Sequence, residues 1–239
     1  MEPGFYNMDC MQAIPQFPDK FFDLAIVDPP YGIGVMSMNY TKSGAVKTQG
    51  NSKAVRRDYR KSGEWDIKPD GSYFRELFRV SNDQIVFGGN YFSDILPPSK
   101  SFIIWDKRVR DEISNDFSDC EYAWMSEKLG VARVFRYLWS GMLQGNMKNK
   151  EERFHPTQKP VALYEWILSN YAKPWMKILD THVGSGSSLI ACHRAGLDYW
   201  GFEIDPEYYA KAKERIDKEA AQVSIQDIIK PQAEQLTLY

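Results

Sequence analysis

The chain has 239 residues, which is enough for one large α/β domain with a buried core. Hydrophobic residues make up 43% and charged residues 26% of it, a composition that excludes disordered, collagen-like and membrane-spanning classes of protein. The 30 basic and 32 acidic residues leave a net charge of -2, so any nucleic-acid partner must be held by a local basic patch. We expect a single domain over residues 1–239.

The first strand is predicted over 21–27, where an apolar run ends at Asp28-Pro29-Pro30-Tyr31. Two prolines after a strand-end carboxylate make a stiff turn, because proline lacks an N–H group and has a fixed φ. Asp28 and the Pro29 carbonyl could accept the two N–H bonds of a planar exocyclic amine, while Tyr31 stacks on its ring. A plain chain reversal is the alternative interpretation of this turn.

Little hydrophobic periodicity follows the turn, and we expect a mobile basic loop over 35–66. Beyond it, two segments at 121–124 and 132–137 alternate in polarity without an intervening helix, which predicts antiparallel neighbours at one side of a sheet. The remaining elements of this region are a helix over 73–80, strands over 84–87 and 101–105, and a helix that begins at Pro160.

The last third of the chain predicts a βαβ unit. Its parts are a strand over 177–180, a glycine turn over 181–187, a helix over 188–195, a strand over 199–202, a helix over 206–219 and a poorly anchored tail from Ser224. Glu203 follows Gly184 by 19 residues, close to the spacing of about 20 in the half-site for an adenosine-bearing cofactor. Position 189 is Leu, so the third glycine of a dinucleotide site is missing, and a structural turn without a ligand is the alternative.

Four motifs in one order resemble the amino-methyltransferases that modify DNA with S-adenosyl-L-methionine. They are the tetrapeptide at 28–31, His155 to Pro160, the turn at 180–187, and Glu203. The tetrapeptide precedes the glycine turn, as in the permuted β class of that family. The resemblance extends from about Asp9 to Ile216 and implies a Rossmann-like α/β methyltransferase fold: a seven-stranded, mostly parallel sheet with one antiparallel strand and helices on both faces.

The resemblance also implies which residues bind S-adenosyl-L-methionine. The glycine turn would wrap the methionine end, Asp180 would lie near the amino group and Glu203 would bind the ribose hydroxyls. Asp9 would meet the adenine, although an N-cap is its alternative role. The full predicted set is Asp9, Thr157, Gln158, Lys159, Asp180, Gly184, Ser185, Gly186, Ser187 and Glu203, with 157–159 beside the cofactor carboxylate.

One departure from the family pattern concerns the glycine turn. Many relatives have Pro-Phe after the first Asp, whereas this chain has Thr181-His182-Val183, so packing against the cofactor is expected to differ there. Methyl transfer from a sulfonium requires geometry more than proton removal, so we do not expect His182 to act as a base. His155 and His193 receive the same structural interpretation.

The implied reaction is methyl transfer to the exocyclic amine of an adenine flipped out of the duplex, with Asp28, Pro29, Pro30 and Tyr31 as the catalytic residues. Adenine is favoured because an Asp at the first position of the tetrapeptide is typical of the family's adenine enzymes and a Ser of its cytosine-N4 enzymes. Cytosine-N4 methylation, an RNA substrate, a binding-only relative and a dinucleotide oxidoreductase remain as alternatives.

The implied partner is double-stranded DNA. We expect its phosphates to be neutralised by Lys42, Lys47, Lys53, Arg56, Arg57, Arg60 and Lys61. A solvated loop without a ligand is the alternative, and the stretches 106–116 and 148–153 are second candidates for DNA contact. The sequence leaves open the recognition site, a homodimer and a restriction endonuclease partner.

Three cysteines, Cys10, Cys120 and Cys192, are odd in number and form no Cys-x-x-Cys pair, which argues against a disulfide framework and a zinc site. No metal is predicted. The first residues lack the basic and apolar parts of a secretory signal, and no apolar run approaches the roughly 18 residues of a membrane span. We expect a cytoplasmic protein of a prokaryotic cell or phage, associated with the nucleoid.

Replacing Arg56, Arg57 and Arg60 together with Ala should weaken DNA binding, because three phosphate contacts are lost. Each contact contributes about 0.9 to the slope of log K against log salt, so the slope should flatten by up to about 2.7 units. Binding to one duplex at several salt concentrations measures it. An unchanged slope would support the solvated loop.

Overall fold

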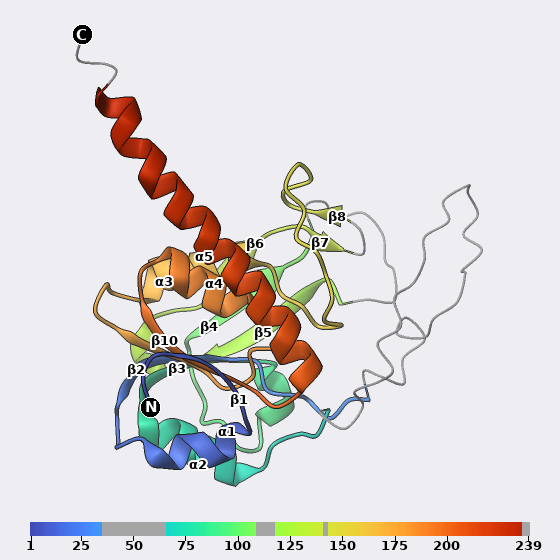
Figure 1. Ribbon diagram of the computed structural model, residues 1–239. Helices are drawn as coiled ribbons and strands as arrows, with labels where there is room; N and C mark the ends of the chain where they lie inside the picture. The colour runs from blue at the N-terminus through green and yellow to red at the C-terminus, as the bar shows by residue number, and fades with distance from the viewer. Residues whose placement is uncertain (35–65, 109–117, 141–142, 236–239) are drawn as a thin grey trace.

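The computed structural model describes residues 1–34, 66–108, 118–140 and 143–235. Its centre is an eight-stranded sheet with the order β1-β10-β9-β2-β3-β5-β4-β6, and β7 pairs with β8 beside it (Figure 1). The strands are β1 (Gly4–Asn7), β2 (Phe22–Val27), β3 (Ser81–Phe87), β4 (Phe102–Asp106), β5 (Cys120–Met125), β6 (Arg133–Arg136), β7 (Trp139–Ser140), β8 (Leu143–Gln144), β9 (Lys177–Asp180) and β10 (Asp198–Glu203). The α-helices are α1 (Cys10–Ala13), α2 (Gly71–Val80), α3 (Val161–Tyr171), α4 (Ser187–Arg194) and α5 (Pro206–Gln235). Three short 3-10 helices are η1 (Ile14–Gln16), η5 (Gly89–Phe92) and η6 (Glu127–Leu129).

The pairing pattern confirms a mostly parallel sheet with one antiparallel strand. In the described part of the sheet, β5 is antiparallel to both of its neighbours, β3 and β4, and every other pair is parallel. The sheet has eight strands rather than the seven expected, because β1 adds an edge strand beside β10. Its four residues are too few for a recognisable apolar run, so the tertiary pairing defines this strand.

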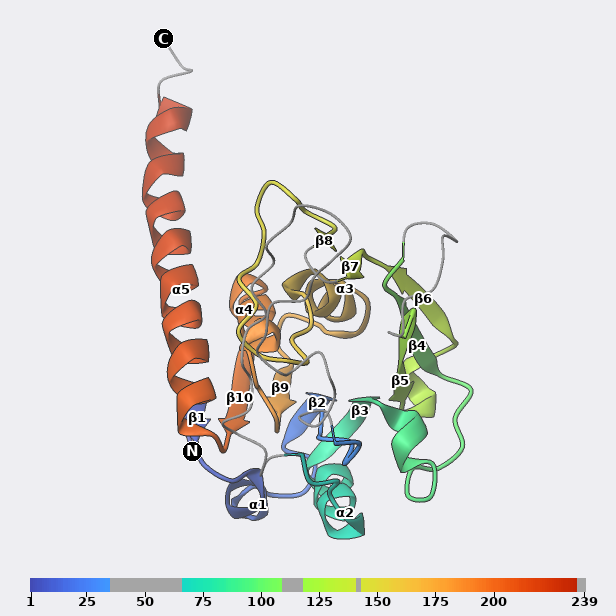
Figure 2. The ribbon, with the colours of Figure 1, turned by 90° about the vertical axis from the view of Figure 1, so that its right-hand side faces the viewer.

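Helices cover both faces of the sheet, as predicted. Figure 2 shows α1 and α2 on one side and α3 and α4 on the other. In β2, Leu24 and Ile26 pack in the cluster of α3 and α4, whereas Ala25 and Val27 pack in the cluster of α1 and α2. A strand buried on both faces has a continuous apolar sequence, which explains the run that precedes Asp28.

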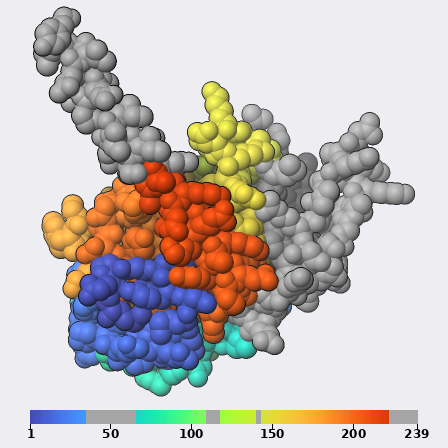
Figure 3. All heavy atoms as spheres, in the orientation of Figure 1, coloured from blue at the N-terminus to red at the C-terminus, as the bar shows by residue number. Residues whose placement is uncertain are grey.

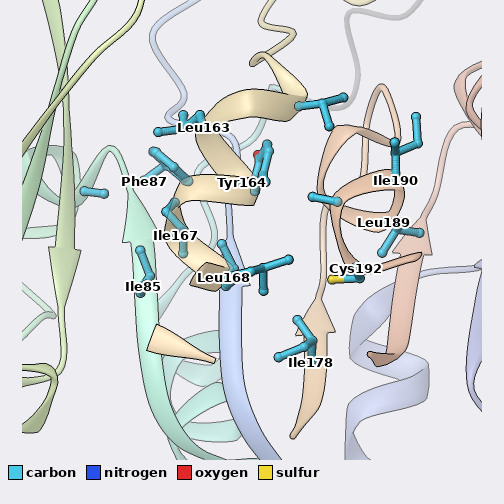
Figure 4. Packing of buried hydrophobic residues seen from close by; sticks show 14 of the residues in the cluster. Ile85, Phe87, Leu163, Tyr164, Ile167, Leu168, Ile178, Leu189, Ile190 and Cys192 are labelled. Atoms are coloured by element: carbon cyan, nitrogen blue, oxygen red, sulfur yellow. The ribbon is translucent and has the colours of Figure 1, made fainter. Parts of the chain in front are cut away.

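The packing under α3 and α4 is close (Figure 4). Side chains of α3, among them Leu163 and Ile167, belong to the same buried cluster as Ile85 of β3. Gly201 in β10 allows α4 to approach the sheet, since a Cβ atom there would lie 2.6 Å from Leu189 Cδ1. The helix that follows the glycine turn is therefore held closely against β10.

The tail and one pair of strands differ from the expectation. The segments predicted as antiparallel neighbours do not pair with each other: β5 lies between β3 and β4, and β6 lies on the far side of β4 and parallel to it. The helix expected to end near Glu219 continues to Gln235. Figure 3 shows the first part of α5 packed on the body of the molecule, where the centroid of the Tyr209 ring lies 4.6 Å from that of Phe5.

None of the helices described is long and apolar enough for a membrane span.

Charged side chains gather at the edge of the sheet that is formed by the carboxyl ends of its parallel strands, because these strands all end on the same side. Asp28 follows β2, while Asp180 and Glu203 are the last residues of β9 and β10. Lys107 follows β4, and Glu121 stands near the start of the antiparallel β5, so both belong to the same edge. This edge contains the candidate site.

Candidate active site

The glycine turn after β9 has the conformation that its sequence requires. Gly184 has φ +55° and Gly186 has φ +80°, a left-handed conformation that side chains rarely adopt. The Glu203 carboxylate accepts hydrogen bonds from the Gly184 N–H at 2.8 Å and the Asp205 N–H at 2.9 Å. Glu203 therefore fixes the turn from the neighbouring strand, and burial raises the pKa of its carboxyl group.

Only part of the turn faces the cavity. Gly184 and Ser185 line it, whereas a Cβ atom on Gly186 would contact Ala212 and Ile216 of α5. Arg215 of α5 donates to the Ser187 Oγ at 2.9 Å. Gly186 and Ser187 thus hold α4 against α5, and the geometry supports a cofactor contact for the first half of the predicted turn.

Asp180 lies behind the cavity wall. It is 2% exposed and accepts hydrogen bonds from the Ser188 hydroxyl and from the His182 N–H at 3.0 Å. Burial raises its pKa to about 7, a rise to which the carboxylates of Asp28 and Glu203 contribute. Its predicted contact with the cofactor amino group stays a prediction.

Three further predicted cofactor residues, Asp9, Thr157 and Gln158, line the cavity. Asp9 is also the N-cap of α1, since its Oδ1 accepts the Met11 N–H at 2.8 Å. The Gln158 side chain is engaged in its own loop, where its Nε2 donates to the Glu152 carbonyl at 2.9 Å. The Gln158 backbone is engaged as well, since its N–H donates to the His155 carbonyl at 3.2 Å and its carbonyl accepts from Trp139 Nε1 at 2.8 Å.

The predicted catalytic tetrapeptide lies at the edge of the same cavity. The Tyr31 hydroxyl donates to Asp28 Oδ1 at 2.6 Å, and the Lys159 ammonium contacts Asp28 Oδ2. The Tyr31 ring stacks on Tyr91, with centroids 4.8 Å apart and planes tilted by 17°. Burial, followed by the charges of Asp28 and Glu121, raises the pKa of Tyr31 well above its usual value, so Tyr31 acts as a neutral donor at pH 7.

A glycine makes room for the Tyr31 ring. Gly88 follows β3 with φ +65°, and a Cβ atom there would lie 2.2 Å from Tyr31 Cε1. Such a distance is shorter than any real contact between carbon atoms. The position of Tyr31 therefore depends on Gly88, for which the sequence analysis predicted no role.

The cavity has a volume of about 370 Å³, within the usual range for small-molecule sites. It joins the predicted catalytic residues to those predicted cofactor residues that line it, among them Asp9, Thr157, Gly184 and Glu203. Three tyrosines that were not predicted, Tyr73, Tyr164 and Tyr208, also line it. Glu121, which contacts Lys159, and Lys107, which contacts Glu121, were not predicted either, although a charged residue at a strand end was the available signal.

The two histidines of the cavity wall are neutral at pH 7. Burial lowers the pKa of His155 to about 3, with Lys159 contributing, and burial lowers that of His182 to about 4. His155 packs edge-on against Tyr208 at 4.4 Å, and His182 Nδ1 lies 2.8 Å from the Thr181 hydroxyl. Within the described ranges, no cluster of three His, Cys, Asp or Glu residues could hold a metal ion.

The predicted DNA-binding residues Lys42, Lys47, Lys53, Arg56, Arg57, Arg60 and Lys61 lie outside the described residues. Most of the second candidate stretch, at 109–117, lies outside them too. The other candidate stretch for DNA contact, 148–153, lies within the described residues, and Lys148 and Lys150 are exposed there.

Comparison with known proteins decides the family. The model of the N6_N4_Mtase family, described as DNA methylase, matches residues 40–214, which is more than half of the chain. The chain belongs to this family of DNA methylases. The matched range contains the cofactor motifs and begins after the Asp28 tetrapeptide.

Curated methylases resemble the chain at moderate identity. The protein YubD of Escherichia coli (strain K12), named as a methylase, is 23% identical over 219 residues and matches 89% of each chain. The type II methyltransferase M.HpaI of Haemophilus parainfluenzae is 41% identical over 71 residues, which are 30% of this chain and 23% of M.HpaI. M2.DpnII of Streptococcus pneumoniae is 29% identical and covers 51% of this chain and 43% of its own.

Solved structures share the fold at low identity. The M1.HpyAVI complex with S-adenosylmethionine has a TM-score of 0.54 and 20% identity, over 88% of this methylase and 98% of that chain. PvuII DNA methyltransferase, which is cytosine-N4-specific, has a TM-score of 0.55 and 11% identity, over 93% of each chain. The methyltransferase fold expected from the motifs is thereby confirmed.

Gly88→Ala should displace the Tyr31 ring, because the new methyl group occupies its space. We expect DNA methylation to slow by roughly 100-fold, the usual penalty for misplacing a reacting group. Steady-state methylation rates measure this. Gly130→Ala is the matched control, since Gly130 also has a positive φ but has nothing within 4 Å of the added Cβ. Equal rates for both variants would contradict a special role for Gly88.

Replacing Asp180 tests its raised pKa. A carboxyl group whose pKa rises from 3.8 to about 7 on folding stabilises the fold below pH 3.8, and this contribution is lost as the pH rises through 7. Asp180→Asn should therefore gain stability relative to wild type between pH 4 and pH 8, by up to roughly 4 kcal/mol. Urea unfolding at a series of pH values measures the difference. A constant difference would show that the Asp180 pKa is ordinary.

Proposed function

We propose that this DNA methylase is an adenine N6-methyltransferase that uses S-adenosyl-L-methionine. The observation that carries the proposal is the single cavity that joins the glycine turn, closed by Glu203, to the Asp28 carboxylate and the Tyr31 ring. One end thus offers an adenosine-type half-site, and the other offers acceptors for an amine.

The residues present fit this cofactor. At Gly184 no side chain separates a ligand from the turn backbone, and Glu203 and Asp9 bring carboxylate oxygens to the same space. When bound, S-adenosyl-L-methionine would supply an electrophilic methyl group, and the S–CH3 bond that breaks would leave its electron pair on sulfur as a neutral thioether.

The chain's own residues prepare the amine. Asp28 and the Pro29 carbonyl would accept its two N–H bonds and so concentrate the nitrogen lone pair on the side of the methyl group. Tyr31 would hold the base plane. Once the N–C bond has formed, the nitrogen carries one proton more than the product, and Asp28 or water takes that proton.

Adenine is preferred because the tetrapeptide begins with Asp28 rather than Ser, in line with the family tendency. Cytosine-N4 methylation is the second candidate, since the cytosine-N4-specific PvuII enzyme shares the fold. Both reactions use the same acceptors on an exocyclic amine, so the product distinguishes them.

Double-stranded DNA is the proposed substrate, bound through the basic residues between Lys42 and Lys61. An exocyclic amine inside a duplex cannot reach a cavity lined by Tyr31 and Asp28, so the base must leave the stack, at a cost on the order of a few kcal/mol. With DNA as substrate, a cytoplasmic location on the nucleoid follows.

The test is incubation of the protein with unmethylated DNA and labelled S-adenosyl-L-methionine, followed by digestion to nucleosides and mass spectrometry. Asp28→Ala should lower the rate by at least roughly 100-fold, while the dissociation constant for the cofactor changes only several-fold. Asp19→Ala, an exposed carboxylate at the opposite edge, is the control.

N6-methyladenine as the product of the wild type would support the proposal, and N4-methylcytosine would replace the target while keeping the mechanism. A product on neither base, with cofactor bound, would shift the function toward RNA or toward a binding-only protein. An active Asp28→Ala variant would contradict the role of this carboxylate.

A further inference from the structure

Lys159 lies between two carboxylates. Its side chain is 3% exposed, its ammonium contacts Asp28 Oδ2, and Glu121 Oε2 is 3.4 Å away. The ammonium also lies over the Phe87 ring, 4.7 Å from its centroid. The two anions and the ring together surround the charged group.

The protonation state of Lys159 follows from these contacts. Burial alone would lower its pKa, but the carboxylates of Asp28 and Glu121 outweigh burial and raise it. Lys159 therefore remains an ammonium ion at neutral pH. Reaching a cofactor carboxylate would require this buried ammonium to leave two partly buried anions, which is costly because all three groups would lose their counter-charge.

We propose that Lys159 and Glu121 are positioning residues for the methyl transfer: Glu121 holds the Lys159 ammonium against Asp28, and Lys159 fixes the Asp28 carboxylate as an oriented anion. The inference rests on the proposed function and gives Lys159 a role on the amine side of the cavity. Glu121 has no role in the mechanism above.

The orientation of the Asp28 carboxylate matters because it must direct a free lone pair at the amine. Tyr31 occupies one position on Oδ1 and Lys159 one position on Oδ2, which fixes the carboxylate plane. Each oxygen retains a second lone pair for an N–H donor. Without the ammonium, Oδ2 loses this partner, and the carboxylate is no longer held in one plane.

The negative charge of Glu121 is compensated by a second lysine, Lys107, at the carboxylate oxygen that does not face Lys159. Lys107 Nζ lies 3.3 Å from Glu121 Oε1, so the charges alternate along Asp28, Lys159, Glu121 and Lys107. The four residues come from the ends of β2, β5 and β4 and from the loop before α3. The sheet therefore sets the relative positions of Asp28, Glu121 and Lys107, and the loop before α3 adds the ammonium between the two carboxylates.

The experiment measures kcat and the Kd for the cofactor separately. Loss of a residue that binds the cofactor raises Kd, whereas loss of a positioning residue lowers kcat. Lys159→Met should lower kcat by roughly 100-fold, while the Kd for S-adenosyl-L-methionine, measured by calorimetry without DNA, stays within about threefold. Lys159→Arg keeps the charge and should recover part of kcat. Circular dichroism and cofactor binding verify that each variant is folded.

Glu121→Gln keeps the shape and removes the charge, and it should lower kcat by about tenfold with Kd unchanged. The same change in the Lys159→Met background should have no additional effect, because Glu121 acts through Lys159. Glu127→Gln is the matched control: its ion pair with Lys100 is 3.5 Å long and 66% exposed on both sides.

Two results would overturn the inference: a Lys159→Met variant with weak cofactor binding and an unchanged kcat, or a Glu121→Gln variant with the wild-type kcat. If Lys159→Met does not fold, Lys159→Arg and Glu121→Gln decide alone. A wild-type chain without product on any DNA would contradict the proposed function and this inference together, whereas failure of the variants in an active enzyme contradicts the inference alone.

Discussion

The site depends on the compensation of charge at the edge where the parallel strands end. A parallel sheet brings the last residues of its strands together, and here three of these positions carry carboxylates: Asp28, Asp180 and Glu203. Each has different partners. Asp28 contacts a buried ammonium, Glu203 accepts from backbone N–H groups, and Asp180, whose pKa burial raises to about 7, accepts from the Ser188 hydroxyl.

These different partners give the cavity two chemically distinct regions, one around Glu203 and one around Asp28. Around Glu203 the donors are backbone groups held by rigid turns, which suits the recognition of a constant part of a ligand. Around Asp28 the donors are side chains, Tyr31 and Lys159, which orient the carboxylate and leave a second lone pair on each oxygen for an incoming amine.

Much of this arrangement could be predicted from the sequence, because the motifs are local. The apolar run before Asp28 predicted a strand, and the spacing between Gly184 and Glu203 predicted that both belong to one cofactor half-site, although the hydrogen bond between them was not predicted. The edge strand β1 could not be predicted, since four residues contain too little pattern. The contact between Lys159 and Asp28 joins residues 131 positions apart, and it depends on sheet register, which no local pattern contains.

The strand order also limits when the enzyme can become active during synthesis. The C-terminal pair β9 and β10 inserts between β1 and β2, the first two strands of the chain. Until about residue 203 has left the ribosome, the N-terminal strands lack their neighbours and the cavity lacks one wall. Such long-range pairing gives a high contact order and slow folding. A truncated chain would therefore expose the apolar edges of β1 and β2 and be prone to aggregation.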